Sequence, residues 1–205
     1  MILHFGDMGM EQRLETEKEL KEQIMDATIL EFNENGVKFT MDDVARRLNI
    51  SKKTIYTVFH DKEALLLEAV DYCFGEIKES EQEILDKENV SVVDKLRRVL
   101  VVLPERYEHL DFRKIYMMKE RYPKIYEKIA VRIESGWDST IMLLEEGIRQ
   151  GLIKDISIPV LKLMVEASIE QFISRKTLID SNIPYEEALE QMIEILMEGI
   201  CTKST

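Results

Sequence analysis

Residues 39–66, FTMDDVARRLNISKKTIYTVFHDKEALL, constrain the fold of this chain more than any other segment. Thr40 precedes a run of apolar residues at helical spacing, and threonine is a favourable N-cap. These apolar positions are Met41, Val44, Ala45 and Leu48. Asn49 follows the last of them, and asparagine tolerates the left-handed conformation that commonly ends a helix. Ser51 can then cap a second short helix, so the segment predicts a helix-turn-helix.

The second short helix has a polar outer face. Ile55 and Phe59 are spaced to point inward, which leaves five residues outside. These are Lys52, Lys53, Thr54, Tyr56 and Thr57. Lysine neutralises phosphates or donates to guanine, threonine contacts bases, and a tyrosine hydroxyl reaches phosphate oxygens. The N-terminal residues of the second helix meet base edges in a helix-turn-helix, so we expect Lys52, Lys53 and Thr54 to do so here.

Phosphate contacts are expected at both edges of this motif. Asp61 is a candidate N-cap, so Lys62 lies at the positive end of the next helix, a favourable site for a backbone phosphate. Thr40 offers a similar contact on the other side. The predicted DNA-binding residues are Thr40, Ser51, Lys52, Lys53, Thr54, Tyr56, Thr57, His60 and Lys62.

A longer pattern surrounds the helix-turn-helix. Its residues are Ile24-Met25-Asp26-Ala27, Phe32, Glu34-Asn35-Gly36, Thr40-Met41, Asp43-Val44-Ala45, Ser51-Lys52, Thr54-Ile55-Tyr56, Phe59 and Lys62-Glu63-Ala64-Leu65. With these residues the chain resembles the TetR family of one-component transcriptional regulators, over roughly its first third; the remainder matches in size and helical layout. Asn49 stands where the family often has glycine, and Lys53 where a small residue or proline is common, which leaves the operator sequence open.

The resemblance implies an all-α fold, with an N-terminal three-helix helix-turn-helix domain and a C-terminal helical domain for ligand binding and dimerisation. We expect the first domain to span residues 1–62, with 1–15 frayed, and the second to span 63–205. The resemblance also implies a homodimer on double-stranded DNA, acting as a repressor that an unidentified small-molecule effector releases from a pseudo-palindromic operator.

Charge distribution separates this interpretation from a simpler one, in which the lysines decorate a solvated corner of a helical protein. The chain carries 28 Lys and Arg against 40 Asp and Glu, a net charge of -12 that by itself argues against a polyanionic partner. Residues 36–62, however, hold six basic and three acidic side chains. The basic excess at the motif favours DNA binding; the alternative is a helical ligand-binding or protein-interaction module without specific operator binding.

Four prolines, at positions 104, 123, 159 and 184, organise the rest of the chain, since proline suits the first turn of a helix. The expected helices run from Asp61 past Glu83 and then over residues 91–103, 105–121, 123–150, 159–179 and 185–201. No segment alternates like a strand.

The last two expected helices carry wide apolar stripes. The first stripe comprises Leu161, Val165, Ile169, Phe172 and Ile173; the second comprises Leu189, Met192, Ile193, Leu196, Met197 and Ile200. The resemblance implies a homodimer joined through residues 159–179 and 185–201 in a four-helix bundle. The alternative is that both stripes pack within their own chain. A two-fold dimer would present its recognition helices about 34 Å apart.

An effector cavity is expected among the helices between Asp61 and Ile179. Candidate lining residues are Tyr107, His109, Tyr116, Met117, Trp137, Met164 and Phe172, a set suited to an apolar ligand with a few polar groups. Methionine and aromatic residues also fill ordinary helical cores, so each residue alone is more readily explained as core.

Catalysis is not expected. The histidines are scattered, no glycine-rich phosphate loop is present, and neither Cys73 nor Cys201 has ligand spacing, so no catalytic residue, metal or cofactor is predicted. No apolar run approaches the roughly 20 residues that span a bilayer. These features favour a cytoplasmic protein with reduced thiols and without a membrane partner.

Overall fold

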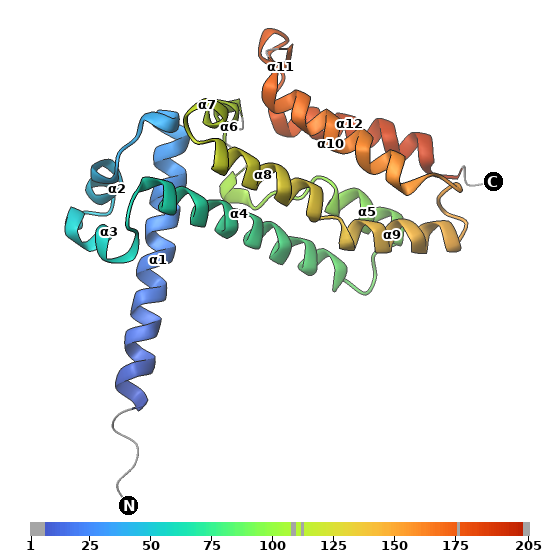
Figure 1. Cartoon of the computed structure of the whole chain (residues 1–205). Helices are drawn as coiled ribbons and strands as arrows, with labels where there is room; N and C mark the ends of the chain where they lie inside the picture. Colours follow the sequence, from blue (N-terminus) through green and yellow to red (C-terminus); the bar gives the residue numbers. More distant parts are fainter. Residues whose placement is uncertain (1–6, 108–109, 112, 176, 203–205) are drawn as a thin grey trace, which may run out of the picture. The chain divides into compact units, whose positions relative to one another are not determined.

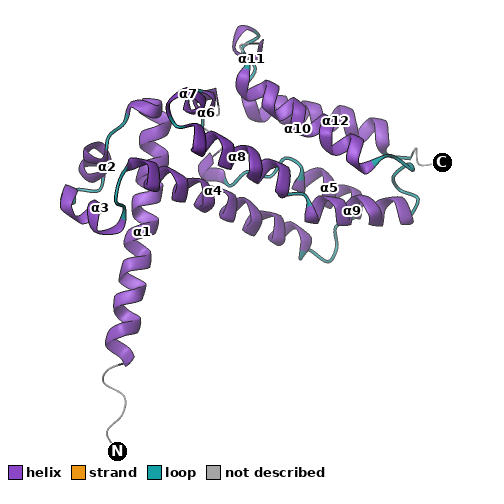
Figure 2. Cartoon of the chain, in the orientation of Figure 1, coloured by secondary structure: helices purple, strands orange, loops and turns teal. Residues whose placement is uncertain are grey.

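The computed structural model describes residues 7–107, 110–111, 113–175 and 177–202, which form helices and connecting loops (Figures 1 and 2). Within these ranges there is no strand, only an isolated bridge between Ile153 and Cys201. The all-α prediction is therefore confirmed. Contacts divide the chain into two compact units, residues 1–72 and 73–205.

The first unit contains α1 (Asp7–Asn35), a 3-10 turn η1 (Gly36–Lys38), α2 (Met41–Arg47), α3 (Lys52–Val58) and the start of α4 (Lys62–Leu85). Gly36 has a φ of 56°, a left-handed conformation that lets the chain turn directly after α1. Helix α1 packs against α2, and α2 against α3. The buried side chains of this unit include Ile24, Met25, Val44, Ala45, Ile55, Phe59 and Leu65.

Helix α4 confirms the long helix predicted from Asp61 past Glu83. Asp61 caps it, since Asp61 Oδ1 accepts a hydrogen bond from the Ala64 amide at 2.8 Å. The division between the two units falls within this helix, after Tyr72.

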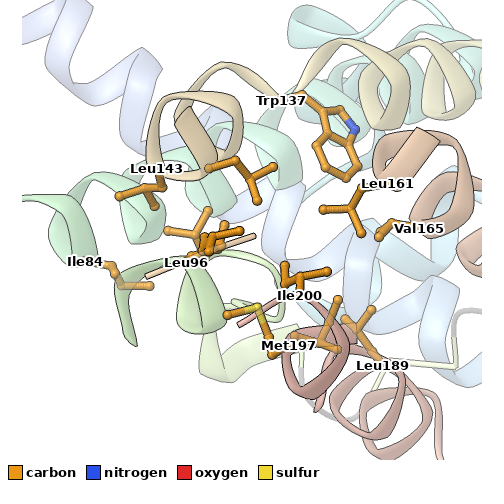
Figure 3. Packing of buried hydrophobic residues seen from close by; sticks show 13 residues of the cluster. Ile84, Leu96, Trp137, Leu143, Leu161, Val165, Leu189, Met197 and Ile200 are labelled. Carbon is orange, nitrogen blue, oxygen red and sulfur yellow. The ribbon is translucent and has the colours of Figure 1, made fainter. Parts of the chain in front are cut away.

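The second unit has a core made by helices from its whole length. They are α5 (Val92–Val99), η2 (Glu105–Tyr107), α6 (Arg113–Tyr116), α7 (Met118–Arg121), α8 (Pro123–Ser135), α9 (Asp138–Arg149), α10 (Ile158–Ser174), α11 (Thr177–Asp180) and α12 (Tyr185–Ile200). Figure 3 shows side chains of α4, α5, α9, α10 and α12 meeting in one apolar cluster. Leu96, Leu144 and Met197 at its centre are fully buried.

The continuous helix predicted over residues 123–150 is wrong, because the structure breaks it between Ser135 and Asp138. Glycine at position 136 weakens a helix interior by about 1 kcal/mol. The freed carbonyls of Glu134 and Gly136 accept hydrogen bonds from lysine side chains, Lys162 at 2.8 Å and Lys78 at 2.6 Å. The break turns Trp137 into the core, where it is 7% exposed.

Three other predicted helices are shorter than expected. Helix α5 ends at Val99 rather than near Leu103, and Leu100 caps it with its amide donating to the Leu96 carbonyl at 3.1 Å. The helix predicted over 105–121 is divided into η2, α6 and α7, with Tyr107 turned inward to bury its ring. Helix α10 ends at Ser174, short of residue 179, because Arg175 is extended.

Candidate nucleic-acid interface

Helix α2 is fixed at its start by a reciprocal capping box. The Thr40 hydroxyl accepts a hydrogen bond from the Asp43 amide at 3.3 Å, and the Thr40 amide donates to Asp43 Oδ2 at 2.8 Å. The side-chain and backbone hydrogen bonds from Thr40 hold the pKa of Asp43 below its usual value. The predicted N-cap is confirmed, and both oxygens of Thr40 already have partners in the protein.

The turn after α2 is a Schellman motif. Asn49 has a φ of 55°, and its amide donates to the Arg46 carbonyl at 3.1 Å. The Ile50 amide donates to the Ala45 carbonyl at 3.0 Å, which completes the pair of bonds that define this motif. The left-handed asparagine expected from the sequence is therefore confirmed. It stops α2 and directs the chain into α3.

Helix α3 begins with a second cap. Ser51 Oγ accepts a hydrogen bond from the Thr54 amide at 3.1 Å and lies 2.8 Å from Thr54 Oγ1. Thr57 Oγ1 donates to the Thr54 carbonyl at 2.6 Å. Buried Ile55 and Phe59 anchor the opposite face, as expected. Ser51 and Thr54 thus use polar atoms to hold the helix, while Thr57 remains exposed.

The exposed cations of α3 differ in their surroundings. Lys52 Nζ donates to Asp42 Oδ2 at 2.9 Å and lies 5.9 Å from the centre of the Tyr56 ring. The hydrogen bond to Asp42 raises the pKa of Lys52. Lys53 is exposed and has no ion-pair partner among the described residues. The 45% exposed Tyr56 completes an outward face of cations and a hydroxyl.

Arg47 fastens α2 to α1 rather than facing outward. Its Nε donates to Glu31 Oε1 at 2.8 Å, and its Nη2 donates to Glu34 Oε2 at 2.5 Å. Glu31 is 8% exposed at its side chain, and its hydrogen bond raises the pKa of Arg47. This bridge holds the helix-turn-helix on its support.

The residues at the start of α4 differ in the direction of their side chains. His60 is 92% exposed at its side chain, and its Nδ1 lies 3.0 Å from Asp61 Oδ2. Lys62 points inward, because its ammonium donates to the carbonyls of Val37, at 2.8 Å, and Phe39. It also lies 3.8 Å from the centre of the Phe39 ring. The described contacts of Lys62 are structural, and its role as a phosphate contact stays a prediction.

Eight of the nine predicted DNA-binding residues have exposed or half-buried side chains and lie on the two short helices, at their caps or directly beside them. Lys62 alone is turned into the protein.

The acidic neighbour Asp42 was not predicted from the sequence, because its contact with Lys52 spans ten positions and two helices. The role of Arg47 was not predicted either. Its signal, a basic residue opposite Glu31 and Glu34, is visible only when α1 and α2 are packed together.

The predicted effector residues divide between the core and the surface. Tyr107 is 1% exposed and donates its hydroxyl to the Glu76 carboxylate, which also binds Arg106 Nη1 at 3.0 Å. Burial is the main cause that raises the pKa of Tyr107 and keeps it a neutral donor. The ring of Trp137 lies beside Leu161 in the apolar cluster (Figure 3).

The other candidates are less enclosed. Tyr116, Met117 and Met164 are exposed, and Phe172 is half-buried with its ring edge-on to Tyr185 at 6.5 Å. His109 lies outside the described residues. Tyr107 and Trp137 therefore remain the interior candidates.

The two C-terminal helices present apolar residues on two faces each. The stripes recognised in the sequence pack within their own chain, since Leu161, Val165 and Ile193 are buried in the apolar cluster. A different set stays exposed: Val160, Leu163 and Met164 on α10, and Ile195, 70% exposed, on α12. Helices α10 and α12 contact each other, so these residues belong to one packed pair of helices.

Two other kinds of site are absent from the described ranges. No described helix combines the length and apolar character needed to cross a membrane. Nor does this part of the chain contain a cluster of three or more histidine, cysteine or acidic side chains arranged to hold a metal ion.

Comparison with known proteins supports the interpretation of this region. Residues 24–69 match the family model of bacterial regulatory proteins, tetR family, and so include α2, the turn and α3. An uncharacterised HTH-type transcriptional regulator of Bacillus subtilis, YvaF, is 26% identical over 181 residues, covering 88% of this chain and 95% of that protein. The Staphylococcus aureus negative regulator of the biofilm operon icaADBC, IcaR, is 27% identical over 139 residues, covering 67% of this chain and 68% of its own.

A solved structure of a similar fold extends over most of the chain. The transcriptional regulator FadR of Bacillus subtilis, crystallised in complex with stearoyl-CoA, superposes with a TM-score of 0.60 over 87% of this chain and 98% of its own. At 21% identity this likeness concerns the fold alone.

Proposed function

The chain belongs to the tetR family of bacterial regulatory proteins, and we propose that it is a homodimeric repressor released from a pseudo-palindromic operator by a small-molecule effector. The family match and the relatives in sequence support a DNA-binding transcriptional regulator. The operator, the effector and the direction of regulation belong to the proposal. Repression is favoured because the relative IcaR is a negative regulator. The proposal assigns no reaction to the chain.

One observation carries the proposal: the buried face of α3 is fixed by the protein, and its exposed face is polar. The Schellman turn at Asn49, the Ser51 cap and the Arg47 bridge fix its direction. Its outer face presents Lys52, Lys53 and Tyr56. A helix fixed in this way can enter the major groove as a rigid body, so that its side chains meet defined base edges.

We assign different roles to the predicted DNA contacts. Lys52 and Lys53 would contact base edges or phosphates, while Tyr56 and Thr57 would bind phosphate oxygens. Ser51 and Thr54 act mainly through the cap of α3. Thr40 and His60 would contact the backbone at the two edges of the motif.

We propose that residues 159–179 and 185–201 join two copies through the exposed set on α10 and α12. Leu163 and Ile195, 64% and 70% exposed, are the most exposed of these apolar residues, and water contact with them is unfavourable. Their replacement by glutamate should give monomers in sedimentation equilibrium. The matched control is Met142→Glu on α9, at 53% exposure, which should leave the dimer intact.

An effector in the second unit would act by favouring one conformation of α4, which runs from the first unit into the second. The fold of FadR, which binds stearoyl-CoA, accommodates a ligand, and Tyr107 and Trp137 are the interior candidates in this chain. To shift the bound population substantially, the effector must prefer one conformation by a few kcal/mol. A ligand that binds without changing operator affinity is not the inducer.

The test is selection of genomic DNA fragments by the full-length protein, followed by titration of the best fragment. Enrichment of one pseudo-palindrome is expected, and Lys52→Ala with Tyr56→Ala should remove the preference for it while the variant stays folded and dimeric. A control variant, Lys87→Ala on an exposed loop of the second unit, should bind as the parent does. If the folded dimeric parent enriches no sequence, the operator-specific proposal is refuted in favour of a ligand-binding or protein-interaction module.

A further inference from the structure

A second basic stretch lies outside the helix-turn-helix. Residues 113–132 hold seven basic and two acidic side chains, a larger excess than the six and three of residues 36–62. The basic ones are Arg113, Lys114, Lys119, Arg121, Lys124, Lys128 and Arg132. The chain as a whole is acidic, with 28 basic against 40 acidic residues. This concentration of positive charge therefore calls for a physical explanation of its own.

Helix α8 arranges three of these cations in a row. Lys124, Lys128 and Arg132 follow one another at intervals of four residues, so they rise by about 6 Å per step and about 12 Å in all. Together with Glu127 and Val131 they line a shallow depression on the surface of α8. Val131 is 52% exposed, so the depression is open to solvent.

Two further cations, on α7, lie over aromatic rings. Lys119 Nζ lies 5.6 Å from the centre of the Tyr116 ring and 5.5 Å from that of Tyr126. The Arg121 guanidinium lies 5.8 Å from the Tyr122 ring. Such contacts restrain a cation without neutralising it. We refer to Lys124, Lys128 and Arg132 as the α8 basic face.

We propose that the α8 basic face binds the phosphate backbone of DNA, as a second, sequence-independent contact surface in addition to the helix-turn-helix. This inference rests on the proposed function. A row of cations over about 12 Å matches an extended anion with regularly spaced charges better than a single small anion. Lysine and arginine on one helix face are the usual electrostatic footprint of a nucleic-acid partner.

Both units of the chain carry net negative charge. Residues 1–72 hold nine basic and fifteen acidic side chains, and residues 73–205 hold nineteen and twenty-five. Repulsion between either unit and DNA weakens association at long range, so a local basic face is needed wherever the protein approaches the phosphates. Phosphate contacts by the second unit offset that repulsion, and they add affinity without adding sequence preference.

The test compares the salt dependence of DNA binding in matched variants of the full-length protein. Lys124→Gln, Lys128→Gln and Arg132→Gln are combined in one variant. The control combines Lys87→Gln, Arg98→Gln and Arg149→Gln, which remove the same charge from exposed positions of the same unit. A third variant, Lys124→Arg, Lys128→Arg and Arg132→Lys, keeps the charge. Each protein is titrated with the selected operator and with random duplex at 50–200 mM salt.

The α8 variant should show a flatter plot of log affinity against log salt, by about 0.9 for each phosphate that the protein no longer neutralises. Its affinity for operator and for random duplex should fall by the same factor. The charge-retaining variant should match the parent, and the control variant should keep the parent's slope. If the triple variant melts at a lower temperature than the parent, the three single substitutions are tested instead. Each of them should flatten the salt slope by a part of the change expected for the triple variant.

Three outcomes would overturn the proposal. An unchanged slope in the folded α8 variant excludes phosphate contacts at this surface. If the control variant shows an equally flattened salt slope, the effect comes from the change in net charge and not from the α8 basic face. Loss of the dimer in the α8 variant, seen by sedimentation, assigns the surface to an acidic face of a second copy instead. Failure of the parent itself to bind any DNA is a separate result, which refutes the proposed function.

Discussion

Replacing Asp42 by asparagine should tighten DNA binding. In the free protein the Asp42 carboxylate accepts a hydrogen bond from Lys52 Nζ at 2.9 Å, and it lies beside the face that we assign to DNA. A phosphate that binds Lys52 must displace this carboxylate and also meets its negative charge. Asp42→Asn keeps the shape of the side chain and removes both effects.

The size of the effect follows from the exposure of the pair. The side chains of Lys52 and Asp42 are 52% and 51% exposed, so their ion pair is largely screened by water. Exposed ion pairs of this kind change an equilibrium constant by about 1.5- to 5-fold, which is the gain in affinity expected for each protomer. Because two protomers would bind one operator, the two gains multiply to about 2- to 25-fold tighter binding. Each newly available phosphate contact should steepen the salt slope by about 0.9, or about 3.5-fold between 50 and 200 mM salt.

The assay is fluorescence anisotropy of labelled operator at several salt concentrations, with Asp155→Asn as the control. Asp155 is an exposed acid of the second unit, so this control changes the net charge equally. We expect the Asp42 variant to bind more tightly with a steeper slope, and the Asp155 variant to match the parent. Unchanged or weaker binding by the Asp42 variant would refute the reasoning that Asp42 competes with phosphate for Lys52. An equal gain in both variants would attribute the effect to net charge alone.

The caps and glycines give further predictions. Thr40→Ala should lower the free energy of unfolding by about 1 kcal/mol, measured in urea. Because the Thr40 hydroxyl donates to the Asp43 carboxylate and lowers its pKa below 3.8, this part of the stabilisation is present above that pH and is lost as the pH falls through the folded pKa. The difference in stability between the parent and the Thr40 variant should therefore narrow in acid to the part that the hydrogen bond from the Asp43 amide contributes, and a constant difference would contradict this. Gly147→Ala should destabilise by about 1–3 kcal/mol, because its Cβ would lie 2.5 Å from Ile153 Cδ1. Gly75→Ala, which meets nothing within 4 Å, should stabilise α4 by about 0.5–1 kcal/mol, and thermal melts that ranked these two variants in the opposite order would refute the packing argument.

Local chemistry made the helix-turn-helix predictable from the sequence. The caps at Thr40, Ser51 and Asp61 each depend on residues no more than three positions away. The left-handed turn at Asn49 likewise depends on the backbone of its immediate neighbours. Short-range hydrogen bonds of this kind depend on adjacent residues, so the helices and their order could be inferred before any packing was known.

The contacts of the charged residues were harder to predict from the sequence than the helix caps. The basic excess of residues 36–62 and the larger one of residues 113–132 are both evident from the sequence, whereas the depression that Lys124, Lys128 and Arg132 share with Val131 is seen only in the structure. In the same way, the partner of Lys52 could not be inferred, since Asp42 approaches it only after the turn folds.

The sequence by itself determined the helical class, the three caps, the turn and the outward face of α3, because each follows from periodicity or from neighbouring residues. The tertiary structure decided where the later helices end. It broke the expected helix at Gly136 to bury Trp137, and it turned Tyr107 inward towards Glu76. It also buried the apolar stripes of α10 and α12 in their own chain and left Leu163 and Ile195 exposed. These outcomes depend on burial against residues distant in sequence, whose contribution outweighs the local preference of any single helix.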